Sequence, residues 1–318
     1  MRQGWLFGLG CGLGAVLLLG IAELAPLTAL LIYGIPMGPF VAGLVSGVGP
    51  ALLAALVFLL VALMFSPTSA AILFATLALP AALLSWQALQ RPGGAGRTSS
   101  GAAPQWTSAG SLLGSLALGG AAIGLAAQIA IGSQQEEAVR FLMAQMAPLT
   151  EPGPDGRTQI EPNQLESLVT ASLEAAPLGV GAIWVLVMAV NGALAQAIAR
   201  NLGRNLRPSP SYRRARVPGW VLYAMGAALL LGLAPDPLGR VGTVVGILLA
   251  MGYLMQGLAV MHVLARRTGG GRWLLIPFYI LFVVVGPLMP FAVVVLGLVE
   301  DHVRYRDREG GPVGKEDE

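Results

Sequence analysis

The chemistry open to this chain is limited by the residue types that it lacks. Its 318 residues include one cysteine, two histidines and a single lysine, Lys315. A disulfide within the chain is excluded, and few ligands remain for a metal site. The sequence contains no Gly-x-Ser-x-Gly, no His-Glu-x-x-His and no phosphate-binding glycine loop, the patterns typical of several hydrolase, metalloprotease and nucleotide-binding families. We therefore expect no enzyme, no metal site and no cofactor.

Polar side chains inside long apolar tracts are the better candidates, because burying them in hydrocarbon is costly and they usually face protein, water or a ligand. Asn191 and Trp184 lie seven residues apart in the tract 175–198, which places them two turns apart on one helix face. This spacing predicts a pocket in which the Asn191 amide binds a small ligand against Trp184. The alternative is that Asn191 bonds a neighbouring helix. Gln196 falls on another face, where we expect it to reach lipid headgroups.

Glu23 is a second candidate, because it is the only acidic residue in the first 90 positions and stands shortly before Pro26. If Pro26 opens a helix inside the membrane, Glu23 is a proton or cation site. If the first helical hairpin is short, Glu23 lies at the outer interface and has an ordinary role.

The elements that position these residues follow from composition. The chain is 55% hydrophobic and only 11% charged, against roughly 25% charged in an average soluble domain, which excludes a water-soluble globule. A crossing helix needs about 20 apolar residues, and nine tracts approach that length. The fold expected is an all-α polytopic transmembrane bundle with about eight or nine spans. The tracts are 5–22, 26–45, 50–65, 68–89, 111–131, 175–198, 219–233, 241–264 and 273–298.

Charge sorting predicts the orientation, because cytoplasmic loops carry an excess of arginine and lysine. One connection holds six arginines and no acid: Arg200, Arg204, Arg207, Arg213, Arg214 and Arg216. The segment 133–174 is instead acidic and should face outward, which places the amino terminus in the cytoplasm. We expect the arginine segment to contact anionic lipid headgroups. A docking surface for an acidic protein partner is the alternative, and no specific nucleic acid is expected because no nucleic-acid-binding fold accompanies it.

Two connections have a composition of their own. The segment 91–110 is rich in Gly, Ser, Ala and Thr and is typical of a cytoplasmic linker. It separates a four-span unit, 1–90, from a fifth span at 111–132. In the outward loop 133–174, the stretches 134–145 and 163–173 show helical spacing of apolar residues, which predicts two short amphipathic helices.

The carboxy-terminal part, 175–300, holds the remaining spans and precedes a polar tail, 301–318. Its last tract, 273–298, contains Gly286, Pro287 and Pro290. Either this tract crosses the membrane once, as a ninth span, or it turns back at Gly286 as two half-helices and returns the tail to the cytoplasm. The sequence favours neither alternative.

The residues that follow the last tract resemble the closing motif of the YybS-like family of bacterial membrane proteins. In that family an apolar helix ends in Leu-Gly, followed by an acid and then an aromatic-arginine pair. Leu296-Gly297, Glu300 and Tyr305-Arg306 occupy those places here. The span order and the Pro/Gly-rich stretch 35–50 are also similar. The resemblance implies a multi-pass protein of the bacterial inner membrane and no particular activity. The same glycine and proline pattern distantly resembles the substrate-binding subunits of energy-coupling-factor vitamin transporters.

Two functional hypotheses follow. The first is a transport-related protein, or one that binds a small ligand inside the bundle near Asn191 and Trp184. The alternative is a noncatalytic membrane scaffold, whose acidic outer loop and basic inner loop recruit partner proteins.

Overall fold

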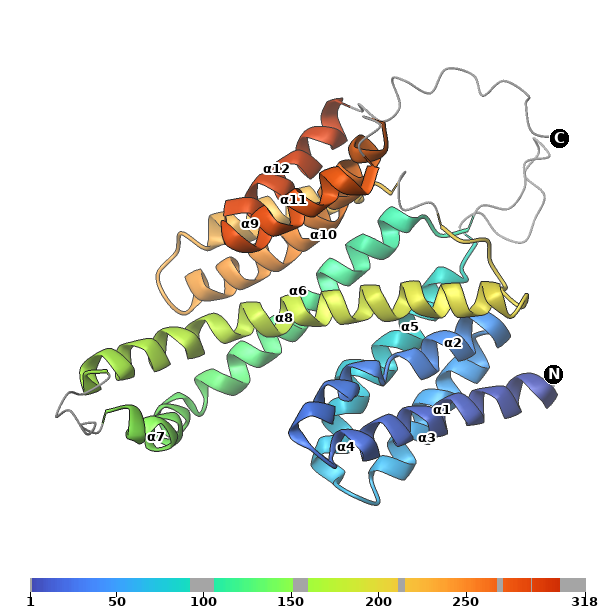
Figure 1. Cartoon of the computed structure of the whole chain (residues 1–318), viewed down its shortest axis with the longest axis horizontal. Helices are drawn as coiled ribbons and strands as arrows, with labels where there is room; N and C mark the ends of the chain where they lie inside the picture. The colour runs from blue at the N-terminus through green and yellow to red at the C-terminus, as the bar shows by residue number, and fades with distance from the viewer. Residues whose placement is uncertain are drawn as a thin grey trace. The chain divides into compact units, whose positions relative to one another are not determined.

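The chain is all-helical throughout the part that the computed structural model describes, which is residues 2–91, 106–150, 160–210, 215–267, 271–286 and 288–303. Within these ranges no strand occurs (Figure 1). This confirms the all-α class predicted from composition.

The first 90 residues form a packed group of helices, coloured blue to cyan in Figure 1. Two prolines and one glycine explain its segmentation. Pro26 opens a 3-10 helix, Pro67 follows the capping residue Ser66, and Gly47, with φ of 99°, breaks the chain between two helices. The elements are α1 (Arg2–Ala22), η1 (Pro26–Gly34), α2 (Met37–Ser46), α3 (Val48–Ala62), α4 (Pro67–Leu73), the π-helix η2 (Phe74–Ala78) and α5 (Leu79–Ala88).

The middle of the chain differs from the prediction in one respect. The first amphipathic helix exists as α7 (Gln135–Met146), between α6 (Ala109–Gly132) and the short η3 (Ala147–Leu149). The second is not a separate helix but the start of α8 (Pro162–Asn201), a continuous helix of 40 residues. Good helix formers, Leu173-Glu174-Ala175-Ala176, join the two parts. At 1.5 Å per residue α8 is about 60 Å long, twice the thickness of the hydrocarbon core.

The carboxy-terminal elements are α9 (Gly219–Leu231), α10 (Leu238–Arg267), α11 (Gly271–Val284) and α12 (Leu288–Val303). The last apolar tract is therefore two helices with a break at Gly286, whose φ is 65°. Phe278 and Val293 stand at similar distances from this break and pack in one buried cluster with Leu254 of α10. The two helices thus fold back on α10 as a hairpin.

Six helical segments in the described ranges are long and apolar enough to cross a membrane: α1, Thr28–Ser46, Pro67–Ala88, α6, α8 and α10. Three more apolar helices are shorter: Val48–Ala62, Gly219–Leu231 and Trp273–Val284. Each of the nine apolar tracts is thus helical, and six of them have the length of a full span.

The chain divides into two compact units. Unit 1 comprises Met1–Ala117, Leu186–Val221 and Ala250–Glu318, and unit 2 comprises Leu118–Val185 and Leu222–Leu249. Small residues let helices approach closely within each unit. In unit 1, Gly43 faces Ser85, and a Cβ added at Gly43 would lie 2.6 Å from the Ser85 Cβ. In unit 2, Gly120 and Gly124 likewise leave room for the backbone of α8 to approach α6 closely.

Candidate functional site

Asn191 is buried in unit 1 and is engaged by another helix. Its Nδ2 donates hydrogen bonds of 2.8 Å to the carbonyl oxygens of Tyr33 and of Val187. Tyr33 lies near the end of η1, where a 3-10 helix would pair its carbonyl with the N–H three residues later. That position is Pro36, which has no N–H. Asn191 therefore supplies a donor that the segment itself lacks.

Trp184 belongs to unit 2, and its ring lies against Gly119 of α6. A Cβ added at Gly119 would come within 2.4 Å of the ring atom Cη2, so the glycine provides the space that the indole fills. Asn191 and Trp184 thus share α8 but belong to different units. The ligand pocket predicted around these two residues stays a prediction.

Unit 1 contains a cavity of about 80 Å³ whose walls are mainly apolar. Its apolar lining is Phe40, Leu44, Leu84, Ala88, Leu112, Leu113, Leu116, Met188, Ala189, Gly192 and Pro210. Three polar residues complete it, Ser85, Gln196 and Arg207, and all three are buried. Asn191 and Trp184 are not among the lining residues.

Arg207 corrects the prediction of a uniform basic patch, because it is only 4% exposed. Its Nη1 donates to the carbonyl oxygen of Ala88 at 2.7 Å and its Nη2 to that of Thr107 at 3.2 Å. Ala88 is the last residue of α5, where carbonyls lack helical partners and a cation is favoured by the helix dipole. These contacts explain how a guanidinium is accommodated in the interior.

The other members of the predicted basic patch are placed differently. Arg200 and Arg204 are exposed, and Arg216 is half-buried. Arg213 and Arg214 lie outside the described residues. Gln196 was expected at the headgroups but is buried, with its Nε2 3.4 Å from both the Arg207 carbonyl and Ser209 Oγ. Gln196 therefore does not extend from the protein surface as expected but lines the buried cavity.

Glu23 lies just beyond the end of α1, in the short connection that precedes η1, and its side chain is exposed. Nearby, Thr28 Oγ1 accepts from the Ala25 N–H at 3.2 Å and caps the start of η1. The role of Glu23 as a proton or cation site stays a prediction.

Unit 2 contains a much larger cleft, of about 920 Å³. Part of its wall is apolar and comes from α6, α8 and α10, through residues such as Leu125, Leu178 and Val244. Its polar residues are Gln128, Gln135, Glu174, Asp236, Arg240 and Thr243. A volume of this size lies within the range of roughly 300–1,000 Å³ that small-molecule sites occupy.

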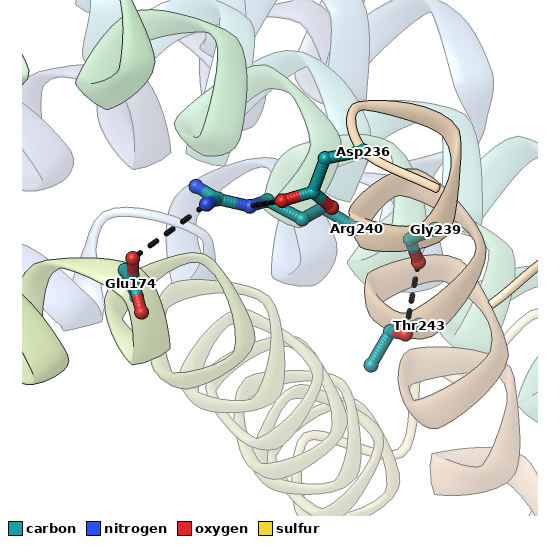
Figure 2. A network of polar contacts seen from close by, with 5 residues as sticks. All are labelled: Glu174, Asp236, Gly239, Arg240 and Thr243. Carbon is teal, nitrogen blue, oxygen red and sulfur yellow. Dashed lines mark hydrogen bonds and ion pairs between the residues drawn. The ribbon is translucent and has the colours of Figure 1, made fainter. Parts of the chain in front are cut away.

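Arg240 is the centre of the polar network in this cleft (Figure 2). Its Nε donates to Asp236 Oδ2 at 2.7 Å, and its Nη2 lies 3.7 Å from Glu174 Oε1. The guanidinium thus joins α8 to the turn before α10, with all three side chains about half-exposed. Two carboxylates and one guanidinium leave the network with a formal charge of −1.

Gln128 adds an acceptor to the same cleft. Its Oε1 is buried and has no hydrogen-bond partner among the residues that the structure describes. A buried amide oxygen without a donor costs about 1–3 kcal/mol, so a ligand donor here would be stabilised. The described residues contain no group of three His, Cys, Asp or Glu side chains arranged to hold a metal ion.

Sequence reasoning missed this network because its members lie outside the predicted apolar tracts: Glu174 within the first half of α8, Asp236 in the turn before α10 and Arg240 in the first turn of α10. The available signal was the spacing of Asp236 and Arg240, four residues apart across Pro237, which suits an ion pair in a helix's first turn. Glu174 could not be joined to them without knowledge of the packing.

The comparisons with known proteins agree with the helical architecture. Neither the curated proteins nor the solved structures include a chain that matches this one significantly. A family model described as "Predicted membrane protein (DUF2232)" matches residues 12–300, which is most of the chain. This chain, with its several apolar helices of membrane length, therefore belongs to the DUF2232 family of membrane proteins.

Proposed function

We propose that this protein binds a small, positively charged or zwitterionic molecule in the cleft of unit 2, at the extracytoplasmic face of the bacterial inner membrane. The observation that carries the proposal is the cleft itself, with its acidic polar network and the buried acceptor of Gln128. Small-ligand sites combine apolar walls with a few convergent polar groups, and this cleft has both.

The charges around the cleft favour a cation. Glu174 and Asp236 outnumber Arg240 within it, and an adjoining hollow adds Glu136, Glu137 and Glu166 against Arg140. The sum over both is five acids and two arginines, a formal charge of −3. A surface of one sign raises the local concentration of the opposite ion and steers its approach.

The side of the membrane follows from the positive-inside rule. Gln135 and Glu174 lie at the two ends of the acidic segment 133–174, and Asp236 lies in the short turn between α9 and α10. The arginine-rich segment 200–216 follows α8 and precedes α9. If 200–216 is cytoplasmic, both parts that border the cleft are extracytoplasmic.

The span count is part of the proposal. We infer eight crossings, with α11 and α12 as a hairpin that enters and leaves on the cytoplasmic side. The break at Gly286 and the shared packing of Phe278 and Val293 on α10 support this.

A titration with ligands of different charge tests the binding. Purified protein in detergent is titrated calorimetrically with choline as cation, glycine betaine as zwitterion and acetate as anion. We expect saturable heats with choline or glycine betaine and none with acetate. Neutralising one half-exposed carboxylate, in Glu174→Gln or Asp236→Asn, should weaken binding about two- to fivefold, because exposed charge pairs contribute up to about 1 kcal/mol.

Glu161→Gln is the matched control, since Glu161 is an exposed acid of unit 2 that lines neither the cleft nor the adjoining hollow. It should leave the affinity unchanged. Preference for acetate, or no saturable binding of any of the three probes, would reject the proposal. Uptake of the bound probe into proteoliposomes then tests whether binding serves transport.

A scaffold remains the second candidate, and α7 is the observation that favours it. This helix buries none of its residues and leaves Phe141 61% exposed. A large apolar side chain exposed on an amphipathic helix suits a protein contact. Phe141→Ser should abolish a scaffold phenotype while leaving choline binding intact, because Phe141 lines neither the cleft nor the adjoining hollow.

A further inference from the structure

We propose that the cavity of unit 1 is a binding site for an anionic phospholipid, with the headgroup at Arg207 and part of an acyl chain between the apolar walls. This site is independent of the cleft of unit 2 and does not rest on the ligand proposed there. Two features support the inference. The cavity has a polar end, formed by Arg207 and Gln196. Basic and aromatic side chains of the kind found at membrane interfaces lie near that end.

The polar end presents groups that recognise an oxyanion. The guanidinium of Arg207 and the amide of Gln196 both line the cavity and are buried, with exposed fractions of 4% and 7%. The carbonyls of Ala88 and Thr107 hold the guanidinium in place. A guanidinium fixed in this way binds phosphate oxygens through charge-assisted hydrogen bonds, with little side-chain entropy left to lose.

The rest of the cavity suits an alkyl chain. Phe40, Leu44, Leu112, Leu116 and Met188 line it with apolar surface, and unbranched Met side chains adapt to an irregular occupant. A volume of about 80 Å³ is well below that of a typical small-molecule site. It therefore fits a few methylene groups better than a vitamin-sized molecule.

The residues around Arg207 place this end of unit 1 at headgroup depth. The guanidinium of Arg91 lies 4.2 Å from the centre of the Trp106 ring, next to Thr107, and that of Arg204 lies 5.7 Å from the ring of Phe7. Basic and aromatic side chains gather at membrane interfaces in this way. A ligand that reaches Arg207 from such a belt is a lipid of the same leaflet rather than a soluble anion.

Gly192 offers a test that leaves the polar end intact. It lines the cavity, and a Cβ added there would lie 3.7 Å from the Phe40 ring, at ordinary contact distance. Gly192→Leu should therefore fold and fill the cavity. Gly179→Leu is the matched control, because Gly179 lies on the same helix with no atom within 4 Å of an added Cβ.

The measurement is native mass spectrometry after exchange into mixed micelles of dioleoylphosphatidylglycerol and dioleoylphosphatidylcholine. We expect the unmodified protein and Gly179→Leu to retain phosphatidylglycerol preferentially, and Gly192→Leu to retain at least about fivefold less. Equal retention of the two lipids, retention of free fatty acid alone, or full retention by Gly192→Leu would overturn the proposal.

A second measurement needs no variant. Phosphatidylglycerol with a photoreactive diazirine on its acyl chain is activated with the unmodified protein, and the labelled peptides are mapped. Label is expected on cavity residues such as Leu112 and Met188. Label confined to exposed apolar residues outside the cavity, such as Leu194, would contradict the site.

Discussion

The Nδ2 of Asn191 lies 2.8 Å from the carbonyl oxygen of Tyr33, so a side chain of α8 satisfies a backbone group that Pro36 leaves without its local 3-10 donor. This relationship gives Asn191 a structural role within unit 1. It also explains why a polar residue is placed at this depth in an apolar helix, where an unsatisfied carbonyl would be costly.

Replacing Asn191 should therefore lower stability. We expect Asn191→Ala to reduce the free energy of unfolding by about 0.6–1.7 kcal/mol, the range measured for hydrogen bonds between membrane helices. Unfolding in mixed detergent micelles with increasing sodium dodecyl sulfate measures this. Asn201→Ala, at the exposed end of the same helix, is the control and should have little effect. Unchanged stability with lost ligand binding would instead support a pocket at Asn191.

Gln256 should be equally sensitive, because it joins two other segments of unit 1. It is fully buried, accepts from the Val217 N–H at 2.7 Å and donates to the Gly297 carbonyl at 2.8 Å. Gln256→Leu removes the acceptor of the buried Val217 N–H and the bond to the Gly297 carbonyl, and should cost about 1–3 kcal/mol. Faster proteolysis of α12 in detergent is the expected readout. Gln90→Leu, an exposed control, should not change the cleavage rate.

The contact between Gly119 and Trp184 predicts a compensating pair of variants in unit 2. Gly119→Ala should destabilise the protein by about 1–3 kcal/mol, because the new methyl group would overlap the indole ring. In a protein that already carries Trp184→Leu, Gly119→Ala should cost less stability than it does in the unmodified protein. Gly226→Ala, with open space around its Cα, controls for the change in helix propensity. Thermal unfolding midpoints of the four variants measure the coupling, and simple additivity would reject the contact.

Arg240 should tune the charge preference of the cleft. Removing its positive charge in Arg240→Gln leaves Glu174 and Asp236 without their shared partner, so we expect choline to bind about two- to fivefold more tightly. The gain should shrink as salt is raised, because half-exposed charges are screened. Calorimetric titration at two ionic strengths measures this, and weaker choline binding by the variant would contradict it.

The carboxyl terminus gives a direct test of the proposed hairpin of α11 and α12. With eight crossings, a reporter fused after Glu318 should be active as a cytoplasmic green fluorescent protein and inactive as an alkaline phosphatase. The opposite result would mean that the last apolar tract crosses the membrane once. Fusions after Gln90, just before the predicted cytoplasmic linker 91–110, provide the reference.

The fold was largely predictable, because length and apolarity decide which segments are membrane helices. Each of the nine tracts is helical, but α8 begins at Pro162, well before the predicted 175, and the last tract is divided at Gly286 into two helices. The packing of the helices was not predictable. Nothing in the spacing of the arginines in 200–216 indicates that the side chain of Arg207, unlike its neighbours, is buried and bonds the end of α5. The network of Glu174 and Arg240 likewise depends on helices that are distant in sequence.

The central claim is that the cleft of unit 2 binds a cation from outside the cytoplasm, and protection of one cysteine tests it most directly. Thr243 lines the cleft, so Thr243→Cys in a Cys11→Ser background places a single thiol there. We predict that a membrane-impermeant maleimide labels it in right-side-out vesicles but not in sealed inverted ones, and that choline slows the labelling. Labelling only from the cytoplasmic side, or a rate that choline does not change, would contradict the account.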